Sequence, residues 1–204
     1  IERFNPAVIA LKKLIDDGHL GKVTSLISKR VGAFPAQIKD ANVIIDLAVH
    51  DIDIFSFLLN KNPDQIHGNA GRALIDGRED YAEIFLAYGD QNGFIQVNWI
   101  TPIRIRNLAV TGTKGYAELN YMTQELTTYQ SNYHQDFDNF GDYIIKFGIP
   151  NKQEVLIEKK EPLALELAHF ISCIQTQSSP LITGEVGLKA LDIALTVMKK
   201  MNMG

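Results

Sequence analysis

The sequence predicts a single α+β domain with a largely antiparallel sheet. Residues 65–160 contain short runs rich in Val, Ile, Tyr, Phe and Thr, broken by the turn sequences DGRED, GDQNG, TP and GTKG. This pattern is typical of antiparallel strands. Segments with helical spacing of apolar residues lie on both sides of that region, and neither a repeat nor a linker divides the 204 residues.

The first elements are predicted to be a helix, a strand and a second helix. Asn5 can cap the first helix and Pro6 suits its first position, after which apolar residues recur at helical spacing until Gly18. The β-rich run KVTSLISKRV follows. A connection containing Gly and Pro, GAFPAQIKDA, then leads to residues 41–59, a segment of helical length.

The later elements are predicted to be the sheet, an irregular excursion and two helices. Within the sheet GFIQVNWIT alternates, so Asn98 and Trp99 are expected on opposite faces, with at most one of them lining a pocket. Residues 131–150 are the least regular part and are expected to form a long loop or hairpin. Helices are predicted over residues 163–176 and 185–201.

Composition and charge narrow the class of protein. The chain is 46% hydrophobic and 22% charged, which is ordinary for a soluble globular protein. With 20 basic and 24 acidic residues and no basic run, we expect no nucleic-acid partner and no membrane partner. Cys173 is the only cysteine, so no disulfide framework or thiolate metal site forms within one chain. Because no apolar run approaches about 18 residues and no signal peptide opens the chain, a cytoplasmic location is expected.

The helix predicted over residues 41–59 carries a polar stripe. At about 100° per residue Asn42, Asp46, His50 and Asp53 fall within roughly 80° of one another, whereas Asp51 points away. Since the other positions are mostly apolar, the stripe is expected to face a crevice. Asp46 and His50 at i,i+4 spacing can pair, and a carboxylate on one ring nitrogen raises the basicity of the other. That pairing suits general acid/base chemistry near neutral pH.

Two other interpretations of the stripe stay open. It can be a helix cap or a satisfied buried pair with no chemical role. It can also supply metal ligands for hydrolysis, although no second His or Glu stands at a recognised zinc spacing, and we assign no metal ligand. The chain has no G-x-G-x-x-G between a strand and a helix, no P-loop and no G-x-S-x-G, so we assign no cofactor-binding residue.

Several segments resemble one known family. They are ERFNPAV, DLAVHDID, LAVTGTKGYAEL and EPLALELAHFISCI with SSPLITGEVGLKALDIA. Together they resemble the C-terminal domain of the glucose-fructose oxidoreductase/inositol dehydrogenase/MocA (Gfo/Idh/MocA) family of NAD(P)-dependent sugar oxidoreductases, over essentially all 204 residues. The resemblance implies an open, mostly antiparallel β-sheet with helices packed on one face, as in the C-terminal domain of glyceraldehyde-3-phosphate dehydrogenase.

The resemblance also implies a domain organisation. Residues 1–204 would be the substrate-binding and oligomerisation domain, and an N-terminal Rossmann domain with the catalytic Lys of a Glu-Lys-Pro motif would be absent from this chain. The start at Ile1, directly before a helix, agrees with a segment of a longer protein. NAD or NADP is expected to be bound mainly by that absent domain.

The family motif on the second helix is a glycine-rich lead, then Asp-x-Gly-x-His and a further Asp. Asp46 and His50 match its Asp and His, while residues 43–45 and Ala48 replace glycines. The resemblance implies that His50 exchanges a proton with the sugar hydroxyl being oxidised, as a hydride leaves the same carbon for the nicotinamide. Asp46 would orient His50 or contact the sugar.

Within the family, SKRVGAFP, IIDLAVHDID and NWITPIRIRNLAVTG most resemble nucleotide-sugar 3-dehydrogenases, in particular those acting on UDP-N-acetylglucosamine. A diphosphate-linked sugar favours arginine ligands, and four arginines are available: Arg3, Arg30, Arg104 and Arg106. The candidate substrate-binding residues are Arg3, Asn5, Arg30, Phe34, Asp53 and Asn98.

The expected partners are a sugar or nucleotide-sugar substrate and further copies of the chain, in a homodimer or homotetramer formed through the sheet face. Two other functions compete with the dehydrogenase. One is a non-catalytic sugar-binding or oligomerisation module. The other is a metal-assisted hydrolase.

Overall fold

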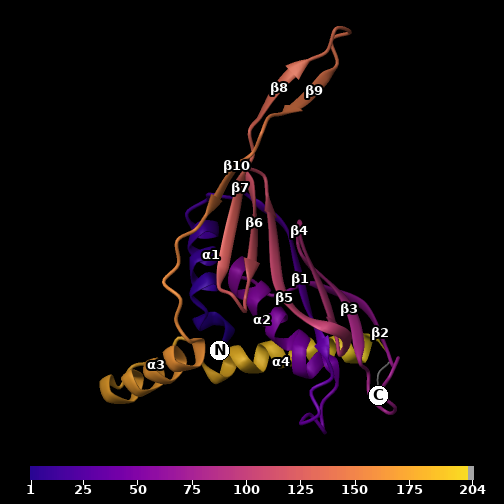
Figure 1. The fold of residues 1–204 in the computed structure, drawn as a ribbon, viewed down its shortest axis with the longest axis vertical. Helices are drawn as coiled ribbons and strands as arrows, with labels where there is room; N and C mark the ends of the chain where they lie inside the picture. The colour runs from indigo at the N-terminus through magenta and orange to yellow at the C-terminus, as the bar shows by residue number, and fades with distance from the viewer. Residues whose placement is uncertain (202–204) are drawn as a thin grey trace.

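The computed structural model describes residues 1–201, within which an eight-stranded sheet is covered on one face by helices (Figure 1). The strand order is β10-β7-β6-β5-β1-β4-β3-β2, and all neighbours are antiparallel except β1 and β4, which are parallel. The strands are β1 (Val23–Ala33), β2 (Gln65–Gly71), β3 (Tyr81–Tyr88), β4 (Gln91–Asn98), β5 (Ile100–Gly112), β6 (Gly115–Asn120), β7 (Glu125–Gln130) and β10 (Asn151–Glu154). The predicted open, mostly antiparallel sheet with helices on one face is confirmed.

The helical elements are η1 (Glu2–Phe4), α1 (Pro6–Asp16), η2 (Ile44–Ala48), α2 (Val49–Leu59), α3 (Pro162–Thr176) and α4 (Gly184–Lys200). Helix α1 begins as predicted, since the Asn5 side chain accepts from the Ala7 N–H at 3.0 Å and Pro6 occupies the first position. The core lies between the sheet and helices α1 and α2, where Leu11, Leu26 and Phe55 are fully buried. Cys173 on α3 is buried.

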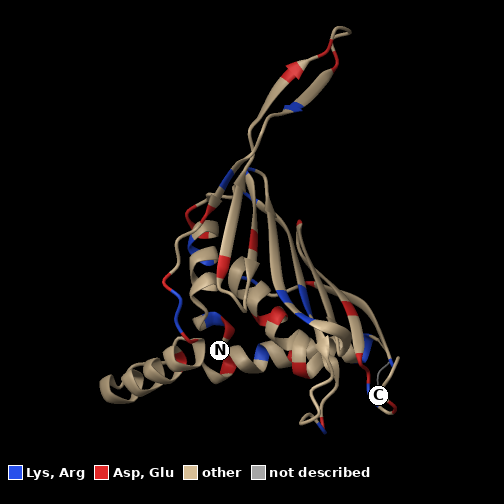
Figure 2. Cartoon of the chain, in the orientation of Figure 1, with Lys and Arg blue, Asp and Glu red and all other residues tan. Residues whose placement is uncertain are grey.

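Residues 131–150 form the predicted hairpin. Strands β8 (Tyr133–Phe137) and β9 (Tyr143–Phe147) pair only with each other and extend away from the main sheet (Figure 1). In the chain they follow β7 and precede β10, which are neighbours in the sheet. Lysines, arginines and acidic residues are scattered over the helices, the sheet and the hairpin (Figure 2). Among residues 1–201, no helix is both long and apolar enough to cross a membrane.

The segment over residues 41–59 differs from the single α-helix that the sequence predicts. It starts with a π-helical turn, η2, and becomes α-helical only at Val49. The Asn42 Oδ1 accepts from the N–H groups of Ile44 and Ile45, at 3.2 and 3.1 Å. Asn42 therefore caps the turn, so its placement in the polar stripe was wrong. Because i→i+5 bonding widens a turn, residues four apart no longer stack as they do in an α-helix.

Candidate functional site

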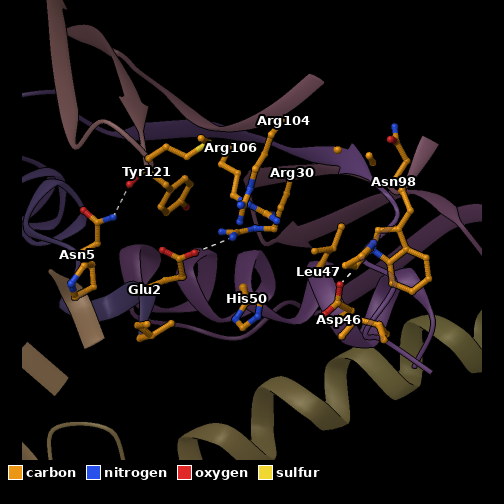
Figure 3. A pocket seen from close by; sticks show the side chains of 18 of the residues that line it. Glu2, Asn5, Arg30, Asp46, Leu47, His50, Asn98, Arg104, Arg106 and Tyr121 are labelled. Carbon is orange, nitrogen blue, oxygen red and sulfur yellow. Dashed lines mark hydrogen bonds and ion pairs between the residues drawn. The ribbon is translucent and has the colours of Figure 1, made fainter. Parts of the chain in front are cut away.

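A cavity of about 650 Å³ lies where η2 and α2 meet the sheet (Figure 3). Asp46 and His50 line it from the helical side, which confirms that this part of the stripe faces a crevice. The facing wall comes from distant segments and includes Glu2, Arg30, Asn98, Trp99, Arg104, Arg106 and Tyr121. Most of these side chains are polar, so the cavity suits a ligand with many hydrogen-bonding groups.

His50 presents an accessible imidazole to this cavity from the first turn of α2. Burial by the surrounding protein, together with the charge of Arg30, lowers the pKa of His50 from its ordinary value of 6.5. The imidazole is therefore uncharged at pH 7. A neutral histidine has one ring nitrogen free to accept a proton, which is the requirement for a general base.

Asp46 does not pair with His50 as the i,i+4 spacing predicted. Its Oδ2 accepts a hydrogen bond from Trp99 Nε1 at 3.1 Å, and no hydrogen bond within residues 1–201 joins Asp46 to His50 (Figure 3). The π-helical turn explains the difference, because Asp46 lies in η2 whereas His50 lies in α2. Asp46 thus anchors the indole that forms part of the cavity wall.

Replacing Asp46 with alanine is expected to lower the free energy of unfolding by about 1–3 kcal/mol, because the buried Trp99 N–H loses its acceptor. In a Trp99→Phe background, where that donor is absent, the same replacement should cost about 1 kcal/mol less. Urea unfolding of the two single variants and the double variant measures this difference. Equal costs in both backgrounds would show that the Asp46–Trp99 hydrogen bond does not contribute.

A buried ion pair forms the back of the cavity. Arg30 on β1 donates from Nε to Asp51 Oδ2 at 2.8 Å and from Nη1 to Glu2 Oε1 at 2.7 Å. Burial opposes the charge on Arg30, but the carboxylates of Asp51 and Glu2 hold its pKa above the ordinary value. The guanidinium carbon also lies 4.9 Å from the centre of the Tyr121 ring, in a cation–π contact. Arg30, a predicted substrate-binding residue, is a fixed part of the wall.

Asp51 supports the cavity wall, and helical periodicity did not identify it as part of the candidate site. It does point away from the stripe, as predicted, but that direction leads to the buried Arg30 and hence to the cavity wall. A carboxylate in an otherwise apolar helix signals a buried partner. The sequence does not identify Arg30 as that partner. Glu2 and Tyr121 were also missed, because their contacts with Arg30 join segments distant in the sequence.

Arg3 and Asp53 lie outside the cavity that contains His50, although both were predicted to bind substrate. Arg3 Nε donates to Asp53 Oδ2 at 2.8 Å, and the Arg3 guanidinium lies 4.8 Å from the centre of the Phe57 ring. The pair lines a separate cavity of about 310 Å³. Asp53 follows His50 by three residues on α2 and faces η1, so the structure does not bring it to the same ligand.

Asn5 and Asn98 line the cavity, as predicted, but part of each amide is already engaged. Asn5 donates from Nδ2 to the Tyr121 carbonyl at 3.0 Å, in addition to capping α1. The Asn98 Oδ1 accepts from the two N–H groups that open β5, at 3.0 and 3.2 Å. In both residues at least one amide N–H forms no hydrogen bond with the described residues.

Trp99 lines the cavity together with Asn98, so the prediction that at most one of them does so was wrong. Strand β4 ends at Asn98 and Trp99 lies in a bend before β5, where the strict alternation of a strand no longer holds. Phe34 does not line the cavity. Its ring packs edge-on against Trp99, with 5.2 Å between the ring centres, so it contacts an indole that forms part of the wall.

The metal interpretation of the stripe has no geometric support. Over residues 1–201, no three His, Cys, Asp or Glu side chains lie close enough together to hold a metal ion. Asp46, His50 and Asp53 face the Trp99 indole, the open cavity and Arg3, respectively.

The one-sided open sheet and the polar cavity at its helical junction define an α+β domain with a cavity large enough for a small molecule. Residues 8–118, more than half of the chain, match the family model described as the GFO/IDH/MocA C-terminal domain. The chain belongs to this family, as the sequence segments suggested.

Two curated relatives illustrate the range of the family. The scyllo-inositol 2-dehydrogenase (NAD(+)) of Bacillus subtilis (strain 168) is 26% identical over 212 residues, covering 93% of this chain and 57% of that protein. The UDP-N-acetylglucosamine 3-dehydrogenase of Acidithiobacillus ferrooxidans is 23% identical over 202 residues, covering 97% of this chain and 59% of that protein. The chain therefore spans less than two thirds of the length of these relatives.

Solved structures share the fold over nearly the whole chain. UDP-N-acetylglucosamine 3-dehydrogenase GnnA from Acidithiobacillus ferrooxidans aligns with a TM-score of 0.79 at 19% identity, covering 99% of this chain and 60% of that one. An aldose-aldose oxidoreductase from Caulobacter crescentus, complexed with glycerol, aligns with a TM-score of 0.77 at 18% identity, covering 98% and 60%.

Proposed function

We propose that this chain is the substrate-binding and catalytic half of an NAD(P)-dependent oxidoreductase that oxidises a sugar hydroxyl to a ketone. The observation that carries the proposal is the neutral His50 imidazole, which faces a polar cavity of about 650 Å³. Family membership supports it, because the relatives that align over most of the chain are inositol and nucleotide-sugar dehydrogenases.

In the proposed reaction the sugar hydroxyl gives its proton to the free ring nitrogen of His50. The C–H electron pair leaves the same carbon as a hydride, and the carbonyl double bond forms. NAD or NADP, when bound, supplies the hydride acceptor. The residues of this chain do not fit the dinucleotide by themselves, because they include no G-x-G-x-x-G turn for its pyrophosphate. We place that binding on a further domain.

Within the reaction, Asp46 and Arg30 act as fixed parts of the wall. Asp46 holds the Trp99 indole, and Arg30 is held by Asp51 and Glu2, so neither needs to reorganise when a ligand enters. The open amide groups of Asn5 and Asn98 are placed to bind sugar hydroxyls. We assign these residues to positioning the substrate and His50 to the proton transfer.

The proposed substrate is a nucleotide sugar such as UDP-N-acetylglucosamine. The relative that acts on this compound aligns with 97% of the chain, and the arginines on β1 and β5 suit a diphosphate. We also propose that the protein forms a homodimer or homotetramer through the face of the sheet that the helices leave uncovered. Ile27 and Phe94, paired in register on the uncovered face, leave 51% and 50% of their surface exposed.

The test uses the full-length protein and follows the reduction of NAD⁺ and NADP⁺ with free sugars, inositols and UDP-sugars. Reduction with at least one sugar or cyclitol, strongest with a UDP-sugar, is the expected result. If none supports reduction while a UDP-sugar still binds, the chain is a non-catalytic sugar-binding module.

The pH dependence of oxidation should carry the signature of His50. Burial and the charge of Arg30 lower its pKa below 6.5, so His50 is mostly unprotonated at pH 7 and takes up a proton at more acidic pH. We therefore expect kcat/KM to fall on the acidic side with a midpoint below pH 6.5. A pH profile of the wild type beside His50→Gln checks this, since the acidic limb should vanish in the variant. A midpoint above 6.5 would contradict the assignment.

A further inference from the structure

We propose that Arg104 and Arg106 on β5 bind an acidic substituent of the substrate, a phosphate ester or a carboxylate, beside the carbon that His50 serves. The inference rests on the proposed function, because it assigns the charged end of the substrate to that same cavity.

Three arginines meet on one face of two adjacent strands. In the antiparallel pairing of β1 with β5, Arg30 stands directly opposite Arg106, and Arg104 precedes Arg106 by two residues on β5. All three line the cavity and their side chains gather at one wall of it (Figure 3). Like charges directly opposite each other destabilise a sheet, so this arrangement requires compensating negative charge.

The carboxylates at the cavity already have partners other than Arg104 and Arg106. Asp51 and Glu2 bond to the Arg30 guanidinium, at 2.8 and 2.7 Å. Asp46 and Glu161, which also line the cavity, accept from the Trp99 indole and from the Ala164 N–H in the first turn of α3, respectively. In the part of the chain that the structure describes, no carboxylate forms a hydrogen bond or an ion pair with Arg104 or Arg106. The wall therefore carries an excess of positive charge on β5.

Arg106 is the arginine that the excess of positive charge destabilises most directly. Its Nη1 is buried and has no hydrogen-bond partner among the described residues. Burial, together with the charges of Arg30 and Arg104, lowers the pKa of Arg106 to about 10. The group is still charged at pH 7, so it remains an unpaired, half-buried cation at the edge of a cavity. An oxyanion beside it would offset this cost.

The geometry favours an anion that belongs to the substrate. Arg104 is exposed and Arg106 is half-buried, so the two form an outer and an inner contact on one path into the cavity. Guanidinium groups bind phosphate and carboxylate oxygens through paired N–H donors. His50 lines the same cavity from the helical side, so a ligand spanning it has its acidic group at β5 and its reacting hydroxyl at α2 (Figure 3).

The first experiment compares substrates on the full-length protein. We would measure kcat/KM for UDP-N-acetylglucosamine, glucuronate and a neutral inositol, and follow the ratio of each acidic substrate to the neutral one. Arg106→Gln should lower that ratio about 10- to 100-fold, the effect of losing a charge-assisted hydrogen bond. Arg106→Lys keeps the positive charge but loses the paired N–H donors of the guanidinium, so its ratio should lie between those of wild type and Arg106→Gln. Lys114→Gln removes a charge from an exposed turn outside the cavity and should leave the ratio unchanged.

The second experiment measures binding without turnover. Isothermal titration calorimetry with pyrophosphate and with glucuronate, at constant ionic strength, distinguishes a phosphate site from a carboxylate site. Wild type should bind at least one of them, and Arg104→Gln and Arg106→Gln should each weaken it. Arg104 is exposed, so Arg104→Gln still tests the site if Arg106→Gln fails to fold.

The outcomes separate this inference from the proposed function. If the protein oxidises a sugar and both glutamine variants keep the wild-type ratio, the inference is wrong and the proposed dehydrogenase function still stands. If oxyanions bind in an arginine-dependent way but no sugar is oxidised, the oxyanion site is supported and the proposed dehydrogenase function is wrong. If wild type binds neither pyrophosphate nor glucuronate and shows no preference for acidic substrates, the positive wall has another counterion and the inference is wrong.

Discussion

Replacing His50 with alanine is expected to lower kcat about 10²- to 10⁴-fold for whichever sugar the full-length protein oxidises, the usual contribution of a general base. The physical reason is that His50 presents a neutral imidazole to the cavity, so its loss leaves the hydroxyl proton without a positioned acceptor. Steady-state NAD(P)H formation measures the effect.

Two controls make the result specific to His50. His50→Gln keeps much of the side-chain volume but cannot take up a proton, so it should be as slow as the alanine variant with a KM closer to wild type. His19→Ala removes an exposed histidine outside the cavity and should leave kcat unchanged. If His50→Ala kept kcat within about threefold of wild type, another group would be the acceptor of the sugar hydroxyl proton, because loss of a general base costs at least about 100-fold in rate.

The Asp51→Ala variant should lose about 3–5 kcal/mol of unfolding free energy, the cost of leaving a buried charge uncompensated. Asp51 is fully buried and bonds to Arg30 through both oxygens, at 2.8 and 3.3 Å. Glu2 alone would then face the buried guanidinium. Urea unfolding followed by circular dichroism measures the change.

A matched surface pair provides the comparison. Asp16→Ala breaks the exposed i,i+4 pair with Lys12 and should cost less than about 1 kcal/mol. The double variant Asp51→Ala/Arg30→Met removes both buried charges and should recover part of the stability lost in Asp51→Ala. If Asp51→Ala cost no more than Asp16→Ala, the buried pair would not hold the wall of the cavity.

Local patterns predicted the elements of the fold well, because each depends on neighbours in the sequence. The cap at Asn5 followed by Pro6 marks the start of α1, and the turn sequences between β-rich runs mark the strands. His50 could also be picked out, since a histidine among acids in an apolar helix is unusual. Its exposure to the cavity agrees with that choice.

α-Helical periodicity gave the wrong side-chain directions in the first turn of the second helix. The Asn42 cap and the π-helical turn η2 change the direction of the side chains up to Ala48. Asp46 consequently bonds to Trp99, and Asn42 is a cap. Asp53, beyond the irregular turn, pairs with Arg3 instead of joining His50. Periodicity is reliable only where the helix is regular.

The sequence by itself determined the class of fold, the order of the elements and the histidine at the centre of the candidate site, because those depend on local spacing and composition. Only the tertiary structure decided which charges meet. Arg30 faces Asp51 through helix–sheet packing and stands opposite Arg106 through the register of β1 with β5. Both are contacts between distant segments, and such contacts arise from the packing of the whole core.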